Sequence, residues 1–218
     1  MIAHIKDNNY WNEYYRSYQD LPEISKPSNF AIFCSQKLDL LFKDKRAKIL
    51  EFGCGNGRDA EHFSLNHEVH ACDLSEVSIK ELQKKSNTKV NYFAADFSKI
   101  KTQEKYDVIY SRFTLHSVDD EAELNTINAA YSILNEEGIF LIETRSNYDE
   151  LCGCGEKISD YEWIYDGHYR RFNVLENFIL RLKSAGFIPK YVIQSNDLAP
   201  FGNRNPVVIR VILKKGHS

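Results

Sequence analysis

The sequence predicts one α/β domain over residues 1–218, built on a mostly parallel, doubly wound sheet of seven strands with an antiparallel last strand. Short apolar runs alternate with helix-like segments from residue 46 to residue 145, which is the pattern of consecutive βαβ units. Two further apolar runs, residues 187–194 and 207–213, are joined without a helix. A short connection of this kind makes the last pair of strands antiparallel.

Residues 1–45 predict a helical prefix before the first strand. The aromatic residues of 10–18 favour a first helix, which the prolines at 22 and 27 end, because the residue before a proline disfavours the helical conformation. Ser28 or Asn29 can cap a second helix. Its buried face is expected to contain Phe30, Phe33, Cys34, Leu38 and Leu41. We expect both helices to pack over the edge or the carboxyl end of the sheet.

Residues 46–145 are expected to form the half of the domain that binds a cofactor. After a first strand that ends at Phe52, strands are predicted at residues 68–73, 89–94, 106–111 and 139–144. Helices are predicted between them at 58–65, from Ser75 to residue 85, and from Asp119 or Asp120 to about residue 134. Residues 135–138 end in a glycine and are expected to stop the last of these helices.

Residues 146–218 are expected to contribute an insert on the acceptor side, then a helix and a hairpin. Residues 145–168 are too irregular for a simple connection. A long loop without secondary structure in a compact domain usually signals function or a local excursion of the chain. A helix over residues 174–184 follows and is stopped by Gly186.

The turn after the first strand, Glu51-Phe-Gly53-Cys-Gly55-Asn-Gly57, points to a ligand. Glycine accepts positive φ and lacks Cβ, so the backbone can turn sharply and lie flat against a ligand. The helix that follows presents unpaired N–H donors. Asp73 ends the second strand at the spacing of an acid that accepts hydrogen bonds from ribose hydroxyls. Together these residues predict a nucleoside site.

The spacing of the glycines separates this turn from a dinucleotide site. The glycines follow Gly-x-Gly-x-Gly after Glu51, whereas dinucleotide sites use Gly-x-Gly-x-x-Gly to bind a pyrophosphate. A carboxylate repels a pyrophosphate but accepts from a cationic amine. The stretch resembles the first motif of the class I S-adenosylmethionine-dependent methyltransferases, with later matches at Asp96 and after Asp107. The resemblance covers residues 46–145 by motif and 172–214 by layout; the alternative is a plain turn in another α/β protein.

The resemblance implies S-adenosylmethionine as cofactor and S-adenosylhomocysteine as product. It places Asp96 near the adenine amine, Phe97 as a flat apolar face beside it, and Ser111 near the methionine part. For Arg58 two alternatives stay open: it pairs with the methionine carboxylate, or it pairs only with surface acids. The cofactor residues that it implies are Glu51, Gly53, Gly55, Gly57, Arg58, Asp73, Leu74, Asp96, Phe97 and Ser111.

Candidate acceptor residues come from the prefix and the insert. Most prefix aromatics suit a core, and Tyr14, Tyr15 and Arg16 are the exceptions we consider for the site. In the insert the candidates are Trp163, Tyr169, Arg170 and Arg171. Adjacent arginines suit a carboxylate or phosphate, which a guanidinium binds through two parallel hydrogen bonds. The alternative is a solvated basic start to the next helix.

Methyl transfer from a sulfonium needs an aligned nucleophile and, where the nucleophile carries a proton, a base. His116, just after strand four, and His168 are the catalytic candidates, with Glu143 and Tyr169 as further possible bases. A histidine of near-neutral pKa suits this role, although a histidine after a strand is equally often structural. No metal is expected, because Cys152-x-Cys154 lacks a second ligand pair and can simply belong to a flexible loop.

Composition narrows the class of protein. The formal net charge of −3 gives no overall attraction to nucleic acid or anionic membranes. No apolar run approaches the ~20 residues that span a bilayer, the N-terminus lacks the apolar core of a signal peptide, and the odd cysteine count favours reduced thiols and a cytoplasmic location.

These observations predict a methyltransferase that acts on an oxygen or nitrogen of a small polar metabolite, including a phosphorylated or carboxylated one. Its partner is then a small-molecule acceptor, with no nucleic acid and no membrane. Neither of the sequence patterns that mark enzymes acting on bases is present, that is, an Asn/Asp-Pro-Pro-aromatic run or a Pro-Cys pair. A methyltransferase for nucleic acid or protein, and a catalytically silent cofactor-binding partner or sensor, are the alternatives. The oligomeric state is not predicted.

Overall fold

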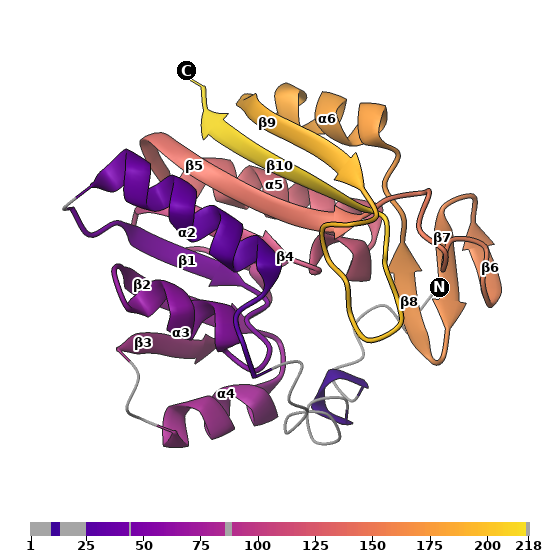
Figure 1. Cartoon of the computed structure of the whole chain (residues 1–218), viewed down its shortest axis with the longest axis horizontal. Helices are drawn as coiled ribbons and strands as arrows, with labels where there is room; N and C mark the ends of the chain where they lie inside the picture. The colour runs from indigo at the N-terminus through magenta and orange to yellow at the C-terminus, as the bar shows by residue number, and fades with distance from the viewer. Residues whose placement is uncertain (1–9, 14–24, 44, 86–88, 217–218) are drawn as a thin grey trace.

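A computed structural model describes residues 10–13, 25–43, 45–85 and 89–216. Its main sheet has seven strands in the order β3-β2-β1-β4-β5-β10-β9, and β1 to β5 run parallel while β10 is antiparallel to both of its neighbours (Figure 1). The predicted fold class is therefore confirmed. The strands are β1 Lys48–Phe52, β2 Glu68–Asp73, β3 Val90–Ala94, β4 Tyr106–Arg112, β5 Leu134–Arg145, β9 Phe187–Ser195 and β10 Val208–Lys215.

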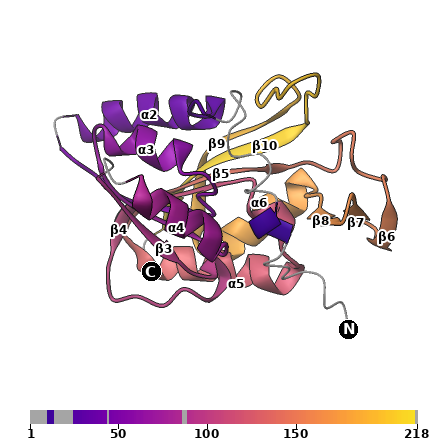
Figure 2. The same ribbon diagram turned by 90° about the horizontal axis from the view of Figure 1, so that it is seen from below.

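Helices cover both faces of this sheet, as Figure 2 shows from below. The helices α2 (Asn29–Phe42), α3 (Arg58–Ser64) and α4 (Glu76–Lys84) pack on one face, and α5 (Asp120–Ile133) and α6 (Leu175–Ser184) pack on the other. The side chains of Ser28, Ser75 and Asp119 accept hydrogen bonds from backbone amides in the first turns of α2, α4 and α5. The helix starts predicted at these residues are confirmed.

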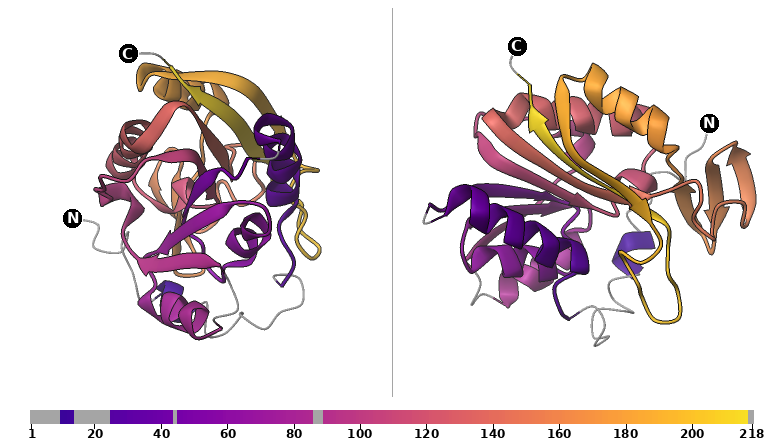
Figure 3. Two further views of the ribbon diagram at one scale, coloured as in Figure 1. Left: turned by 90° about the vertical axis from the view of Figure 1, so that its left-hand side faces the viewer. Right: turned by 45° about the horizontal axis from the view of Figure 1, so that its top comes forward.

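The prefix helix α2 does not lie where the sequence predicted. Phe30, Cys34 and Leu38 are fully buried against the central strands, so α2 covers a face of the sheet and not its edge or carboxyl end (Figure 3, left). Leu41 is 61% exposed, because the packed cluster ends with Leu38 and Phe42. Of the first predicted helix the structure describes residues 10–13, which are helical.

The start of β5 also differs from the prediction. The strand begins at Leu134, so residues 135–138 belong to it and do not form a separate stop. The left-handed residue of this segment is Glu137, with φ of 66°, and not Gly138. Gly138 is needed for space, since a Cβ there would lie 2.8 Å from the backbone oxygen of Asn135.

The insert after β5 is a small antiparallel sheet of β6 (Glu156–Ser159), β7 (Glu162–Tyr165) and β8 (His168–Arg171). It stands clear of the main sheet in the right-hand panel of Figure 3. The predicted insert after the fifth strand is confirmed, but it forms a small sheet and not an irregular loop. Asp166 and Gly167, both with positive φ, form the tight turn between β7 and β8, and an Asp-Gly pair is a hairpin signal that the sequence offered.

In the described part of the chain, no helix combines the length and the apolar character that crossing a bilayer requires.

Candidate functional site

The glycine turn is held by hydrogen bonds and by steric demand. The amides of Gly53 and Cys54 both donate to the carbonyl of Cys72, at 2.8 and 2.9 Å, which ties the turn to β2. Gly53 and Gly57 have φ of 70° and 79°. A Cβ on Gly53 would strike the side chain of Thr114, and a Cβ on Gly57 would lie 2.6 Å from the hydroxyl of Tyr92. The sharp turn predicted at the glycines is confirmed.

Asp73 joins this turn to the next loop. Its carboxylate is buried and accepts from the amides of Gly55 at 2.8 Å and Ser75 at 2.9 Å. Burial raises the pKa of Asp73, and the hydrogen bonds from those amides oppose the increase. Asp73 therefore has a structural role at the cavity wall, and its contact with a ribose stays a prediction.

A cavity of about 300 Å³ lies at the carboxyl ends of the parallel strands. The predicted cofactor residues that line it are Glu51, Gly53, Gly55, Arg58, Asp73, Leu74, Asp96 and Phe97. Gly57 and Ser111 are not among the residues that line it. Ser111 is fully buried behind the wall, where its hydroxyl contacts that of Thr114, which does line the cavity.

The surroundings of Glu51 indicate whether the cavity suits the expected cofactor. The side chain is buried, and its Oε2 has no hydrogen-bond partner among the described residues. Burial raises its pKa well above the ordinary value, and the nearby carboxylates of Asp59 and Asp73 raise it further. A bound ammonium group would supply the missing partner and charge. The amino group of S-adenosylmethionine therefore fits this position.

Asp96 and Phe97 form the far wall of the same end. Asp96 caps a short 3₁₀ turn, where its Oδ1 accepts from the amide of Ser98 at 3.0 Å and from its hydroxyl at 2.6 Å. The ring of Phe97 stacks on Phe52 with 5.8 Å between centroids. This stacking fixes Phe97 as a flat apolar surface in the cavity, as the resemblance implied.

The acidic side chains of the cavity come mainly from the first three strands, and most of its arginines come from later elements. Glu51 lies near the end of β1, Asp73 ends β2 and Asp96 follows β3, and Arg58 stands among them after the glycine turn. Arg112 ends β4 and Arg145 ends β5. Arg170 of β8 also lines the cavity. Sequence reasoning found Arg170 but missed Arg112 and Arg145. Their positions at strand ends on the binding edge of an α/β sheet were the available signal.

Arg112 and Arg145 both lie over the ring of Phe113. Their guanidinium carbons lie 4.5 and 5.2 Å from the centroid of its ring, which is cation–π distance. Phe113 has φ of 53°, an unusual value for a bulky residue, and lines the cavity. Arg145 donates from Nη1 to Asp149 at 2.8 Å, while its buried Nε has no partner among the described residues.

The two candidate histidines meet in the cavity wall. Nε2 of His116 and Nε2 of His168 each lie 3.4 Å from the hydroxyl of Ser117. Burial lowers the pKa of His116 well below 6.5, and the charges of Arg145, His168, Arg170 and Arg112 lower it further. Burial and the neighbouring arginines lower the pKa of His168 to about 3. Both pKa values therefore lie below the near-neutral range expected of a histidine base, and the catalytic role of His116 and His168 stays a prediction.

Tyr10 and Trp11 complete this wall from the prefix. The ring of Tyr10 stacks on His168 with 4.6 Å between centroids, and Trp11 meets the same ring edge-on at 4.9 Å. Both line the cavity. The predicted acceptor residues of this segment, Tyr14, Tyr15 and Arg16, lie outside the described residues.

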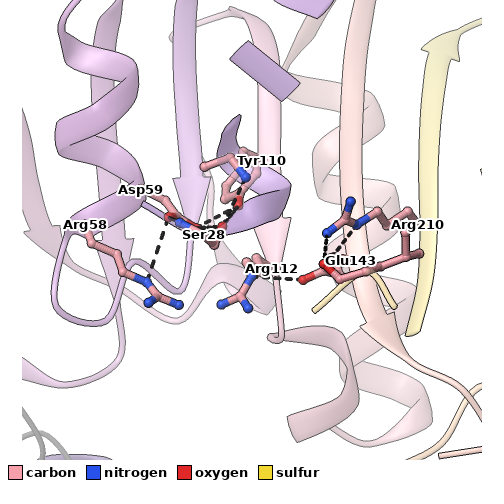
Figure 4. Close-up of polar contacts among 9 residues, drawn as sticks. Ser28, Arg58, Asp59, Tyr110, Arg112, Glu143 and Arg210 are labelled. Carbon is pink, nitrogen blue, oxygen red and sulfur yellow. Dashed lines mark hydrogen bonds and ion pairs between the residues drawn. The ribbon is translucent and has the colours of Figure 1, made fainter. Parts of the chain in front are cut away.

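Glu143 is not placed as a base. It is fully buried and accepts from Nε of Arg112 at 2.9 Å and from Nε of Arg210 at 2.5 Å (Figure 4). Arg210 in turn lies over the ring of Phe30 in α2, 5.2 Å from its centroid. Both carboxylate oxygens are thus engaged by arginines, and Glu143 positions Arg112 at the cavity.

A second buried network contains Asp59, which sequence reasoning missed. Asp59 accepts from the amide and hydroxyl of Ser28, both at 2.7 Å, and from the hydroxyl of Tyr110 at 2.8 Å (Figure 4). It therefore ties the start of α2 to α3. Nε of Arg58 lies 3.9 Å from the buried carboxylate of Asp59.

The remaining acceptor candidates lie away from the cavity. Arg171 is buried and pairs with Asp120 at 3.0 Å and with Glu123, so it joins β8 to α5. This placement contradicts both the predicted grip on the acceptor and the alternative of a solvated helix start. Trp163 and Tyr169 belong to the small sheet and are not among the residues that line the cavity.

Arg171→Ala is expected to lower the free energy of unfolding by roughly 3 kcal/mol, because it leaves the buried carboxylate of Glu123 short of a partner. Urea denaturation measures this loss. Adding Glu123→Gln to the variant removes the uncompensated charge and should restore part of the stability. Unchanged stability in Arg171→Ala would contradict the structural role.

The pKa of His168 gives a second prediction. Its value of about 3 lies below the ordinary 6.5, so below pH 6.5 the unfolded chain binds a proton that the folded chain does not. The stability from the neutral ring is complete above that pH and is lost as the pH falls towards 3. His168→Gln should therefore lose less stability than the parent between about pH 7.5 and about pH 5. Parallel acid-induced changes in the thermal midpoints of the two proteins would contradict this.

The cysteines Cys152 and Cys154 are half-buried free thiols in the loop before β6. Among the described residues, no group of three or more His, Cys, Asp or Glu side chains is arranged to hold a metal ion.

Comparison with known proteins gives a family. Residues 29–188 match the model of the methyltransferase domain family. A malonyl-[acyl-carrier protein] O-methyltransferase from Ilyobacter polytropus is 29% identical over 114 residues, which cover 49% of this chain and 42% of that protein. The chain spans less than half the length of the curated relatives that it matches.

Solved structures share the fold. An S-adenosylmethionine-dependent methyltransferase from Clostridium acetobutylicum aligns with a TM-score of 0.72 at 16% identity, over 96% of this chain and 99% of that one. A Burkholderia thailandensis N1-methyltransferase with bound S-adenosylhomocysteine aligns with a TM-score of 0.72 at 18% identity, over 96% of this chain and 87% of that one. With the family match over residues 29–188, the chain belongs to the methyltransferase domain family and has the fold of its S-adenosylmethionine-dependent class.

Proposed function

We propose that this chain transfers the methyl group of S-adenosylmethionine to an oxygen or nitrogen of a small anionic molecule. One observation carries the proposal: Glu51, Asp73 and Asp96, together with Arg58, line one end of the cavity, and Arg145 and Arg170 line the other. The acidic end suits a cationic donor. The arginine end suits an anion, which guanidinium groups bind with charge-assisted hydrogen bonds.

Different residues of the cavity would bind the cofactor and the acceptor. Glu51 would hold the amino group of the cofactor, Asp73 its ribose, and Asp96 with Phe97 its adenine. When bound, the cofactor supplies a methyl group on a positively charged sulfur. Arg145 and Arg170 would hold the acceptor at the other end. Enclosing both molecules in one cavity aligns them and excludes water, which is the larger part of what this reaction needs from a protein.

The names of the curated relatives support an anionic acceptor. They are O-methyltransferases that act on a malonyl group, and a malonyl group carries a carboxylate. Because the alignments cover less than half of those proteins, their acceptor is not assigned to this chain. A cytoplasmic location stays a prediction, which the free, buried thiols of Cys34, Cys54 and Cys72 support.

The test offers the purified chain methyl-labelled S-adenosylmethionine and three acceptor pools, namely small metabolites, RNA and proteins. We expect label in the small-molecule pool, with binding of the cofactor seen by calorimetry. Label in RNA or protein would instead support a macromolecular acceptor. Binding without transfer to any pool would support a silent cofactor-binding module and would overturn the proposal.

A further inference from the structure

We infer that the methylated atom is an oxygen of a carboxylate held at Arg145 and Arg170, so that the product is a methyl ester. The inference rests on the proposed function and names the chemical class of its acceptor. Two features of the arginine end lead to it, a donor without a partner and the lack of an effective base.

The first feature is the state of Arg145. Nη1 is engaged by Asp149, but the buried Nε has no partner among the described residues. Buried donors in proteins are almost always paired, so a ligand acceptor is expected at Nε. The guanidinium carbon lies over the ring of Phe113, 5.2 Å from its centroid. A carboxylate is the planar anion that matches this fixed set of donors.

Arg170 is the second donor at this end. Its Nη1 donates to the carbonyls of Tyr165 at 2.7 Å and His168 at 3.3 Å, which holds the side chain across the hairpin of β7 and β8. The guanidinium lies 6.0 Å from the centroid of the Tyr165 ring. Arg170 and Arg145 both line the cavity. Arg145 of β5 and Arg170 of β8 can therefore bind the same anion.

The second feature is the lack of an effective base. At this end, the described side chains that line the cavity and can accept a proton at neutral pH are His116 and His168. Arg112 from β4, Arg145 from β5 and Arg170 from β8 act on them, and with burial they hold both pKa values far below neutral. Such histidines remove protons poorly. Glu143, the nearby carboxylate, is engaged by two arginines.

A carboxylate satisfies both features. It is the anion that the arginines bind, and it is a nucleophile that arrives without a proton. One lone pair of its oxygen forms the new O–C bond to the methyl carbon. The C–S bond breaks, and its electron pair stays on sulfur. The anion and the sulfonium become a neutral ester and a neutral thioether, and no proton moves. A hydroxyl acceptor would require a base that this end lacks.

The test uses the chemical stability of the product. The chain is incubated with methyl-tritiated S-adenosylmethionine and either a metabolite extract or malonyl-pantetheine, and the small-molecule product is treated with mild alkali. Methyl esters release volatile methanol under these conditions, whereas methyl ethers and methylamines do not. A matched control replaces the free carboxylate of malonyl-pantetheine by its primary amide, which keeps the size but removes the charge.

We expect tritiated methanol on alkali treatment and a rate that is nearly flat from about pH 6 to about pH 9, where a carboxylate is ionised throughout. Label that is stable to alkali would overturn the carboxylate and leave the proposed methyl transfer standing. So would equal transfer to a primary amide acceptor. Cofactor binding without label in any product would overturn the proposed function itself, and the inference with it.

Discussion

Arg145→Ala is expected to lower kcat/KM for a carboxylate acceptor by about two to three orders of magnitude. The guanidinium would contribute two charge-assisted hydrogen bonds, each worth roughly 1.5–3 kcal/mol, or about one to two decades of affinity. Arg145→Lys keeps the charge but loses the planar pair of donors, so it should recover only a small part of the loss. Steady-state kinetics with both substrates varied measure these values.

The same variant should bind S-adenosylmethionine with an affinity within about twofold of the parent, since twofold is only a few tenths of a kcal/mol. The cofactor end is built on β1 to β3, whereas Arg145 ends β5. Arg46→Ala is the matched control, an exposed arginine just before β1 at the opposite end of the strands. If Arg145→Ala leaves both the KM for the acceptor and the turnover unchanged, Arg145 does not bind the acceptor.

Asp73→Asn is expected to weaken S-adenosylmethionine binding at least about tenfold. The change keeps the size of the side chain but removes the charge that would accept from ribose hydroxyls, and a single charge-assisted hydrogen bond is worth roughly 1.5–3 kcal/mol. Asp73 also accepts from the amides of Gly55 and Ser75. A loss of affinity by itself therefore does not separate the ribose contact from an altered turn.

A ligand analogue separates the two roles of Asp73. S-adenosylhomocysteine and its 3′-deoxyribose analogue are titrated by calorimetry into the parent and into Asp73→Asn. If Asp73 contacts the ribose directly, the deoxy analogue binds the parent more weakly than S-adenosylhomocysteine does. The two ligands then bind the Asp73→Asn variant with nearly equal affinity. A penalty for the deoxy analogue that is the same in both proteins would show that Asp73 only shapes the turn.

Local patterns in the sequence predicted most of the fold. Helix starts at Ser28, Ser75 and Asp119 follow from side chains that cap the amides of the next turn. The positions of the strands follow from apolar runs, although β5 starts earlier than predicted. The glycine turn follows from the conformations that only glycine adopts easily. These signals act over a few residues, so they survive in a single sequence. The small sheet of β6 to β8 was missed because its strands are only 4 residues long.

The sequence by itself determined the glycine turn and the acids at or near the ends of the first three strands, because each follows from its own segment. The tertiary structure decided the other end of the cavity. Arg145 faces His116 and Arg170 only once β5, β8 and the turn after β4 come together. The same assembly buries the two histidines among arginines, encloses Glu143 between Arg112 and Arg210, and turns Arg171 towards α5. Proton affinity and ion pairing depend on groups distant in the chain, so no local pattern encodes them.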